Sequence, residues 1–412
     1  MSLSIAILHY STPPIVGGVE ATVAAHAQVM HAAGHQVLII AGRGGPLPNI
    51  EVLVEPTFSS RTEEGTRIAQ ELAAGLVSEA FETRVAQIAD RLSQALAGVD
   101  ILIAHNILSL HRNLPLTAAL HRLHSAGLAP QIVAWCHNIA WLDPLLRHEL
   151  SDEYPWKLLR TPWPQVRYVV VSNNMRLPVA RLLGVPGEWI SVITPGVDLE
   201  SFLKLEPETM ALIKRFDLLR ADPLLLLPAR LTRHKNIEQA VSITGALRRM
   251  RARPRLLVTG PPGPPGPASS AYIAYLKTLQ RETGAGESVL FLYEHAQRIA
   301  GEAIPMSDAQ LADLYKLADG LLFPSRYEAF GIPLLEAALV GLPIFASDIA
   351  PFREVAGDAG LLFHPEAPPE EVAQHIMHAL HNDRRIALRR RIRLDFSWDA
   401  IYRRSIAPLL GA

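Results

Sequence analysis

The chain has 412 residues, of which 49% are hydrophobic and 19% are charged, and its formal net charge is -1. This length and composition argue against disorder and predict two domains of roughly 200 residues each. The near-neutral charge argues against nucleic-acid binding, because proteins of that class are usually more basic. One cysteine, Cys136, excludes an intrachain disulfide, and no apolar run is long enough to span a bilayer. The start, MSLSIAILHY, lacks the features of a signal peptide, so we expect a cytoplasmic protein.

Short apolar runs alternate with helical patterns along the first half of the chain. We expect strands at residues 5–8, 36–41, 101–104, 132–136, 168–171 and 190–193. Apolar residues at helical spacing predict a helix over residues 19–33 that stops at Gly34. The segment 62–96 is predicted to be one long, partly amphipathic helical region.

The second half repeats this alternation. We expect strands at residues 224–227, 255–259, 289–292, 320–323, 343–346 and 360–363, and helices at 237–249, 307–318 and 334–340. Apolar strands that alternate with helices are typical of doubly wound parallel sheets. The sequence therefore predicts an α/β chain with two Rossmann-like domains, residues 1–200 and 201–396, divided near Pro195 and Gly196.

Polar residues follow the predicted strands in both halves. In open parallel sheets, ligands bind outside the carboxyl ends of the strands. In this chain those ends carry His9, His105, His137, Ser172, Arg230, Thr259, Glu294, Arg326 and Asp348. Their recurrence predicts two ligand-facing edges with a cleft between them.

A glycine pair, Gly17 and Gly18, lies between a predicted strand and the helix that follows it. Glycine lets the backbone approach a phosphate, and the amino end of a helix favours negative charge. The chain has neither a G-x-G-x-x-G motif nor a P-loop motif, which argues against a dinucleotide enzyme and a P-loop NTPase.

The segment YEAFGIPLLE, residues 327–336, is a second candidate phosphate site. Pro333 suits the first position of a helix, so the N–H groups of Leu334 and Leu335 are expected to be unpaired and to face an anion. Glu328 precedes this helix and Glu336 lies in its first turn. Two carboxylates around free amides suit a polyol that is attached to a phosphate, although a carboxylate there also complements the helix dipole.

Two cations, Arg230 and Lys235, follow the predicted strand at 224–227. Near a phosphate site they suit a diphosphate, because arginine binds it bidentately and lysine acts as a compact charge. Surface charge is the alternative interpretation. Cys136 lies in an apolar run, which is typical of a structural thiol, although its place beside His137 also allows a nucleophile.

These residues closely resemble the family-4 retaining glycosyltransferases over nearly the whole chain. The most specific match is residues 307–365, which hold the family's E-x7-E element as Glu328 and Glu336. Further matches are Gly17-Gly18-Val19-Glu20, Pro195-Gly196-Val197-Asp198, and Ala229-Arg230-Leu231 with Lys235. The chain departs from the family at Ala329, where glycine is frequent, and at Thr194-Pro195-Gly196, where many members have Pro-Asn-Gly.

The resemblance implies a GT-B fold, with two Rossmann-like domains that face a central cleft and with residues 397–412 returning to the N-terminal domain. It also implies retaining transfer of a hexosyl unit from a nucleoside diphosphate sugar, bound by the C-terminal domain. The acceptor hydroxyl, on a small molecule, glycan or glycolipid, would bind the N-terminal domain.

Residue roles follow from the same resemblance. Arg230 and Lys235 would hold the diphosphate, Glu328 the sugar hydroxyls and Glu336 the ribose. Gly18 would approach the distal phosphate, and His137 would lie near the sugar. The expected catalytic residues are therefore Arg230, Lys235, Glu328 and His137. The expected donor-binding residues are Gly17, Gly18, Gly260, Ala329, Phe330, Gly331, Ile332, Leu334, Leu335 and Glu336.

We expect no metal and no cofactor, because no cluster of His, Asp or Glu has metal-ligand spacing. The basic segments 248–255 and 384–393 could make a weak peripheral membrane contact or be solvated helix faces. Three other activities remain open: a glycoside hydrolase with two carboxylates, a sugar-nucleotide epimerase, and an inactive subunit that binds a sugar nucleotide.

Overall fold

The computed structural model describes residues 2–59, 61–295, 298–299, 302–303 and 306–411. The chain forms two compact units. The N-terminal unit consists of Met1–Val197 and Phe396–Ala412, and the C-terminal unit consists of Asp198–Asp395. Among the described residues, no helix is both long and apolar enough to cross a membrane.

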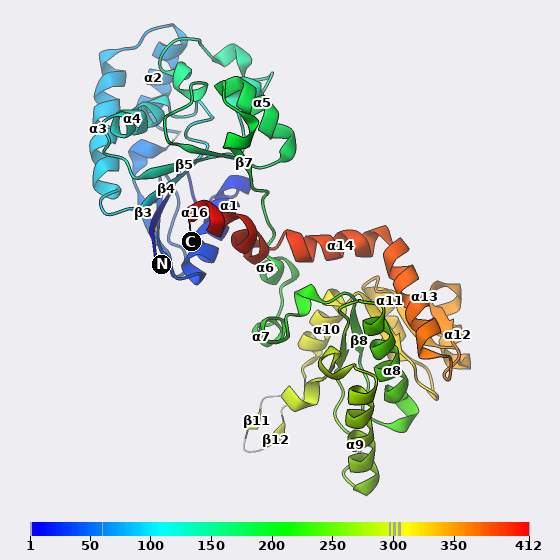
Figure 1. The fold of residues 1–412 in the computed structure, drawn as a ribbon. Coiled ribbons are helices and arrows are strands. Elements are labelled where there is room, and N and C mark those ends of the chain that lie inside the picture. Colours follow the sequence, from blue (N-terminus) through cyan, green and yellow to red (C-terminus); the bar gives the residue numbers. More distant parts are fainter. Residues whose placement is uncertain (1, 60, 296–297, 300–301, 304–305, 412) are drawn as a thin grey trace. The chain divides into compact units, whose positions relative to one another are not determined.

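A seven-stranded parallel sheet forms the centre of the N-terminal unit (Figure 1). Its strand order is β3-β2-β1-β4-β5-β6-β7, and every neighbouring pair is parallel. The strands are β1 (Ser4–His9), β2 (Gln36–Ala41), β3 (Glu51–Val54), β4 (Ile101–His105), β5 (Gln131–Cys136), β6 (Arg167–Val170) and β7 (Ile190–Val192). The helices are α1 (Gly18–Ala32), α2 (Glu63–Ala73), α3 (Glu79–Ala95), α4 (Leu114–Ser125) and α5 (Asn173–Leu183).

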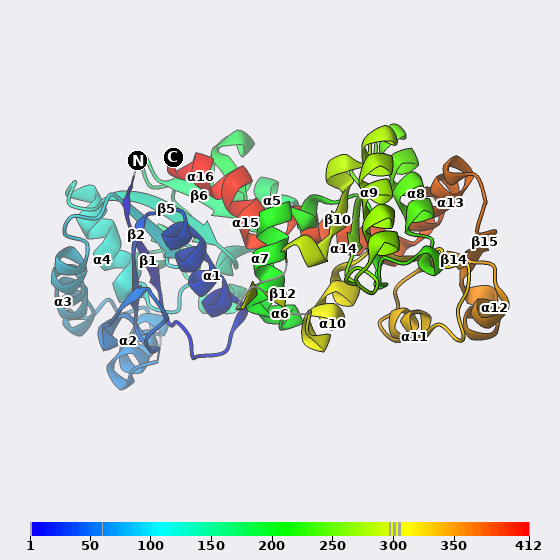
Figure 2. The ribbon, with the colours of Figure 1, turned by 90° about the horizontal axis from the view of Figure 1, so that it is seen from below.

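Successive strand residues point to opposite sides of this sheet, and a separate hydrophobic core covers each face. Ala6 and Leu8 belong to a core that includes side chains of α2, α3, α4 and α5. Ile5 and Ile7 belong to a second core with α1, which lies across β1 and β2 (Figure 2). The C-terminal residues also join this second core, through Trp398 among others.

The C-terminal unit repeats this plan with six parallel strands in the order β10-β9-β8-β13-β14-β15. These strands are β8 (Leu224–Leu227), β9 (Arg255–Val258), β10 (Val289–Phe291), β13 (Gly320–Phe323), β14 (Ile344–Ser347) and β15 (Leu361–Phe363). The helices are α6 (Leu199–Leu203), α7 (Pro207–Phe216), α8 (Ile237–Arg249), α9 (Pro267–Glu282), α10 (Asp308–Leu317), α11 (Ile332–Leu339), α12 (Ala350–Ala356), α13 (Pro369–Asn382) and α14 (Arg384–Asp395). A small antiparallel pair, β11 (Arg298–Ile299) and β12 (Glu302–Ala303), lies outside the sheet. The prediction of two Rossmann-like parallel sheets is confirmed.

The structure differs from the sequence predictions in two places. Segment 62–96 is two helices rather than one, because Gly75 turns the chain with a φ of 81° and Ser78 caps α3. Strand β3 had not been predicted, since this edge strand is largely exposed and has no buried apolar run. Residues 398–410, within the segment 397–412 that was expected to be helical, form an unbroken helical segment of α15 (Trp398–Ile401), a π-helical turn (Tyr402–Ile406) and α16 (Ala407–Leu410).

The chain crosses between the units at residues 197–198 and 395–396. The two connecting segments are hydrogen-bonded to each other, because the Val197 N–H donates to the Phe396 carbonyl over 2.8 Å. Gly196 packs so closely here that an added Cβ would lie 2.8 Å from the Trp398 ring and 2.9 Å from the Ile401 side chain. Glycine is therefore needed at this connection for close packing.

The basic segment 384–393 is not simply a solvated helix face. Arg393 is buried, and its guanidinium donates to the Leu317 and Ala221 carbonyls and to Asp319. Arg390 pairs with Asp222. These arginines hold α14 against the core of the C-terminal unit, which leaves fewer charges for contact with a membrane surface.

Candidate donor-binding site

Two loops meet at the carboxyl edge of the C-terminal sheet. One loop follows β8 and carries Lys235, and the other follows β13 and carries Glu328. They are joined by the Arg326 N–H, which donates to the His234 carbonyl over 2.8 Å. The Arg326 guanidinium also donates hydrogen bonds to the Glu238 carboxylate over 2.6 Å and to the Glu366 carboxylate over 2.7 Å. This network fixes the two loops against each other.

Lys235 and Glu328 form an ion pair across these loops, with the Lys235 ammonium donating to Glu328 Oε1. Their side chains are 25% and 15% exposed, so the pair is partly screened from water yet open to a ligand. The Lys235 Nζ also lies 5.3 Å from the centre of the Phe323 ring. The structure thus brings two predicted site residues together, in mutual contact.

Glu336 lies in α11 and accepts a hydrogen bond from the Tyr315 hydroxyl, with 2.6 Å between the oxygens. Tyr315 is buried, and burial together with the Glu336 charge raises its pKa, so the hydroxyl stays a donor at neutral pH. The bond orients the Glu336 carboxylate before a ligand binds. Sequence reasoning had not identified Tyr315, which in the sequence is one apolar-face residue of a helix.

Two glycines shape the loops of this site. Gly331 has a φ of 114°, and a Cβ there would lie 2.7 Å from the Phe352 ring. At Gly260 a Cβ would lie 2.2 Å from the Ala229 carbonyl oxygen and 2.5 Å from the Arg230 nitrogen. Gly260 therefore allows the loop after β9 to touch the loop that carries Arg230.

The start of α11 differs from the expectation. The helix begins at Ile332, so Pro333 occupies its second position rather than its first, and Glu336 lies beyond the first turn in which it was predicted. The Leu334 N–H donates to the Gly331 carbonyl over 2.9 Å, and the prediction that this amide is unpaired is therefore wrong. The Leu334 side chain is fully buried in the core, whereas Leu335 is 47% exposed. A free amide at Leu335 stays a prediction.

The remaining predicted residues of this unit lie at its surface. Arg230 is exposed, and within the described part of the chain its guanidinium makes no hydrogen bond or ion pair. Exposed side chains also occur at Ala329, Phe330 and Ile332. Arg230 is thus available to an incoming anion.

The glycine pair of the N-terminal unit lies beside a carboxylate. A Cβ on Gly17 would be 2.1 Å from Glu20 Oε2, and Ser11 donates to Glu20 Oε1 over 2.7 Å. A Cβ on Gly18 would meet open space. Glu20 therefore occupies the approach to Gly17, and Gly18 is the more accessible backbone position.

His137 also belongs to the N-terminal unit, where its Nε2 lies 2.8 Å from His105 Nδ1. Its backbone N–H donates to the Asn106 side-chain oxygen over 2.8 Å. Burial and the neighbouring His9 lower the pKa of His137 to about 4, so its imidazole is neutral at physiological pH. Burial raises the pKa of the adjacent Cys136 to about 12, which disfavours the thiolate needed for a nucleophile.

Among the described residues, no group of three or more His, Cys, Asp or Glu side chains is placed to hold a metal ion. Among the described residues at the carboxyl edge of the C-terminal sheet are the Lys235–Glu328 ion pair, the exposed Arg230 guanidinium and the Glu336 carboxylate that Tyr315 orients. This combination can bind an anion and sugar hydroxyls side by side.

Comparison with known protein families gives one match in each unit. A family model described as Glycosyltransferase Family 4 matches residues 16–201. A second, described as Glycosyl transferases group 1, matches residues 212–394. Together they cover most of both units, including both loops of the candidate site.

Individual relatives match more locally. O-antigen chain mannosyltransferase B of Escherichia coli is 38% identical over 96 residues, which are 22% of this chain and 25% of that protein. D-inositol 3-phosphate glycosyltransferase of Saccharomonospora viridis is 29% identical over 324 residues, which are 70% of this chain and 71% of that protein. The chain thus spans about a quarter of the first relative's length.

Solved structures align along the full length at low identity. A glycosyltransferase from Rickettsia africae is 16% identical with a TM-score of 0.39, covering 99% of this chain and 98% of that one. Anabaena Alr3699/HepE, solved with UDP and glucose, is 18% identical with a TM-score of 0.36, covering 100% of both chains. One of these family models matches each unit. The chain therefore belongs to the family-4 glycosyltransferases, also described as glycosyl transferases group 1.

Proposed function

We propose that the chain transfers a hexosyl unit from a nucleoside diphosphate sugar to an acceptor hydroxyl and retains the anomeric configuration. The observation that carries this proposal is the joined pair of loops in the C-terminal unit, where Lys235 contacts Glu328 and α11 presents Glu336. A cation beside two carboxylates suits a donor that carries phosphate charge and sugar hydroxyls together.

In the proposed step, the bond between the anomeric carbon and the diphosphate oxygen breaks. The acceptor oxygen bonds to the same face of the anomeric carbon, and its proton passes to the departing phosphate. Negative charge grows on the diphosphate, where Arg230 and Lys235 would stabilise it. Glu328 would accept hydrogen bonds from sugar hydroxyls, and Glu336 from the ribose.

The other predicted residues would support binding of the donor. Gly18 would let the backbone approach the distal phosphate, and neutral His137 would exchange a hydrogen bond with the sugar. Gly260 and Gly331 would shape the donor pocket of the C-terminal unit with the backbone of Ala329, Phe330, Ile332, Leu334 and Leu335. Gly17, in the N-terminal unit, stays a predicted donor-binding residue. We infer that no divalent metal is required, because two cationic side chains would meet the diphosphate.

The names of the relatives guide the choice of donors. The E. coli relative is named a mannosyltransferase, and the Saccharomonospora viridis relative is named a glycosyltransferase. We therefore propose that mannose be tested first and that glucose be compared with it, each linked to uridine, guanosine or adenosine diphosphate. Alkyl glycosides serve as acceptors.

The test is transfer after exhaustive chelation, with the product's anomeric configuration read by NMR. The proposal predicts a retained configuration and a rate that chelation does not change. An inverted product, or activity restored only by added magnesium or manganese, would contradict it. A donor sugar that changes without any acceptor would instead identify an epimerase.

A further inference from the structure

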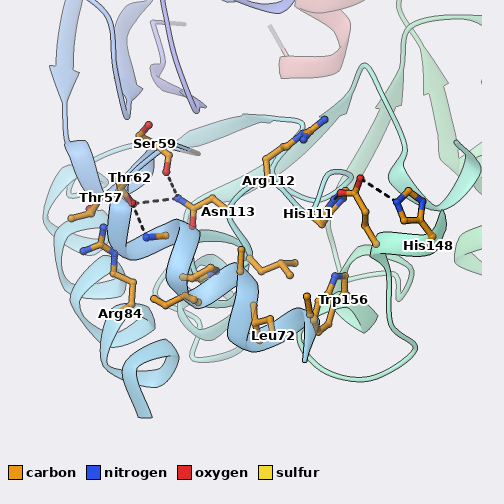
Figure 3. Close-up of a pocket in the computed structure, with 17 residues that line it drawn as sticks. Thr57, Ser59, Thr62, Leu72, Arg84, His111, Arg112, Asn113, His148 and Trp156 are labelled. Carbon is orange, nitrogen blue, oxygen red and sulfur yellow. Dashed lines mark hydrogen bonds and ion pairs between the residues drawn. The ribbon is translucent and has the colours of Figure 1, made fainter. Parts of the chain in front are cut away.

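Each unit contains a pocket, and the two pockets differ in what they would bind. In the N-terminal unit, a pocket of about 340 Å³ has Arg84, His111, Arg112 and Trp156 among its lining residues (Figure 3). The family resemblance already assigns the acceptor to this unit, so that pocket needs no other explanation. In the C-terminal unit, a pocket of about 410 Å³ is lined by side chains from residues 217–221, 248–255 and 287–288. This second pocket is called the amino-edge pocket below.

The amino-edge pocket lies across the C-terminal sheet from the donor site. Its lining comes from the end of α8 and from the segments that precede β8, β9 and β10. The donor-site loops instead follow β8 and β13, at the carboxyl edge. Strand β8 has four residues and therefore spans about 13 Å, so one phosphate group cannot contact both sites. A ligand in the amino-edge pocket would not occupy the donor site.

The charged residues of the amino-edge pocket are the arginines Arg220, Arg248, Arg253 and Arg255 and the carboxylates Asp217 and Glu287. The positive charges outnumber the negative charges by two. A phosphate monoester has about -1.5 to -2 charges at pH 7, so one such group would balance the lining. A single carboxylate on a ligand would leave one positive charge unbalanced.

Two of these arginines are fixed by neutral groups. The Arg248 guanidinium donates to the Gly284 carbonyl over 3.0 Å, and the Arg255 guanidinium donates to the Glu287 carbonyl. A carbonyl accepts an N–H group but does not cancel the positive charge, and each guanidinium has five N–H donors. Both arginines can therefore donate to an anion while they stay bound to the protein.

The other two arginines are less engaged. Arg253 is exposed, and its guanidinium makes no hydrogen bond or ion pair with any residue that the structure describes. Arg220 Nε lies 3.7 Å from Asp217 Oδ2, and these two side chains are 56% and 59% exposed. An exposed ion pair of this kind contributes little to stability, so an incoming phosphate can replace it.

Main-chain bonds hold the arginines in one place. The Arg253 N–H donates to the Asp222 carbonyl over 2.9 Å, and the Asp222 N–H donates to the Arg253 carbonyl over 2.8 Å. The Arg255 N–H donates to the Pro223 carbonyl over 2.9 Å. These bonds join the segments before β8 and β9, and the Arg255 side chain joins them to Glu287. The backbone that carries the cations is thus ordered before a ligand binds.

The rest of the lining disfavours other ligands. Its apolar side chains are Ala221, Ala252 and Pro254, which offer little surface to an acyl chain. None of the described lining residues is aromatic, so a nucleobase would have no ring on which to stack. Stabilisation of the helix dipole explains Arg248, which lies in the last turn of α8, but it does not explain Arg253.

We propose that the amino-edge pocket binds a phosphate monoester, supplied by a small molecule in solution or by a lipid headgroup. The proposal does not depend on the proposed transfer reaction, because no donor-site residue takes part. It also gives the basic segment 248–255 a defined ligand, since three of its arginines line this one pocket.

The test uses two probes that present the same group: glycerol 3-phosphate, and vesicles of phosphatidylcholine and phosphatidic acid. Arg253→Gln removes the unpaired guanidinium and should weaken binding at least about tenfold, as measured by calorimetry or vesicle co-sedimentation. The matched control is Arg251→Gln, which removes the same charge at an exposed position outside the lining. It should bind as the wild type does.

The probes distinguish the source of the phosphate. Binding of glycerol 3-phosphate supports a ligand in solution, and binding of the vesicles alone supports a lipid headgroup, provided that Arg253→Gln binds more weakly than Arg251→Gln. Equal affinity in these two variants would overturn the proposal, because binding would then reflect diffuse surface charge or the donor site. Failure of both probes to bind the wild type would overturn it as well. Neither result bears on the transfer reaction, which is assayed separately.

Discussion

At the residue scale, the candidate donor site consists of side chains that neighbouring groups have already oriented. Lys235 contacts Glu328, and Tyr315 fixes Glu336 through a 2.6 Å hydrogen bond. Preorganised groups cost little to align when charge develops on a substrate. The ion pair also means that the Lys235 charge is balanced until a diphosphate arrives.

Replacement of Glu328 tests this pairing. Glu328→Gln keeps a carbonyl acceptor and should leave measurable transfer, whereas Glu328→Ala should lose on the order of 10²–10³ in kcat. Both variants release Lys235, so nucleoside diphosphate affinity should stay equal or rise. Steady-state kinetics and calorimetry measure the two effects. Equal losses in both variants, or a sugar found covalently attached to Glu328 by mass spectrometry, would refute this role.

A second residue-scale prediction concerns His26, which lies between Trp135 and Trp398 at ring-centre distances of 4.4 and 5.2 Å. It is fully buried, and burial together with the neighbouring His137 lowers its pKa to about 3. The unfolded chain would take up this proton near pH 6.5, so the stability that neutral His26 contributes is present above pH 6.5 and is lost as the pH falls toward 3.

His26→Phe keeps an aromatic ring and removes this titration. The variant should lose less free energy of unfolding than the wild type between pH 7 and pH 4, as measured by urea denaturation. It should also gain about 1 kcal/mol at pH 7, because two ring nitrogens have no partner within the described residues. His31→Gln, at an exposed position of the same helix, is the control. An identical pH dependence in His26→Phe and the wild type would be evidence against this explanation.

At the scale of elements, the donor site depends on how loops after parallel strands are held together. Arg326 joins the loop after β13 to the loop after β8 through its main-chain N–H, which donates to the His234 carbonyl, and its guanidinium, which donates to the Arg233 carbonyl. Gly331 lets the first of these loops turn into α11 against Phe352. The elements therefore place Glu328 and Glu336 through contacts that neither glutamate makes itself.

Gly331→Ala should distort this turn. The substitution adds a Cβ 2.7 Å from the Phe352 ring at a φ of 114°, and we expect a loss of about 2–4 kcal/mol of unfolding free energy with weaker diphosphate binding. Gly341→Ala, which follows the same helix, is the matched control. Its φ of 69° adds strain but its Cβ meets open space, so the loss should be about 1–2 kcal/mol. Equal losses in urea denaturation would show that contact with Phe352 is not limiting.

At the scale of the whole molecule, the fold was largely predictable, because buried strands such as β4 and β8 are continuous apolar runs. The edge strand β3 was missed for the opposite reason, since most of it is exposed. The break between α2 and α3 depends on Gly75 and the Ser78 cap. A prediction from the spacing of apolar residues does not take these two residues into account.

The candidate site was predictable only in part. Motif spacing identified Lys235, Glu328 and Glu336, but not the residues that orient them. Tyr315 is 21 residues from Glu336 in sequence, and Arg326 is 88 residues from Glu238. Contacts over such separations follow from the folded sheet and have no local pattern. The N-terminal pocket was missed for the same reason, because its lining comes from several separate segments.

The central claim is that the C-terminal unit holds a nucleoside diphosphate through Lys235 and Glu336. Calorimetric titration of the wild type, Lys235→Ala, Glu336→Ala and the control variant Arg251→Gln with UDP, GDP and ADP tests it most directly. We expect one diphosphate to bind the wild type and Arg251→Gln alike, and both donor-site variants to bind it at least about tenfold more weakly. Unchanged affinity in Lys235→Ala and Glu336→Ala would contradict the claim.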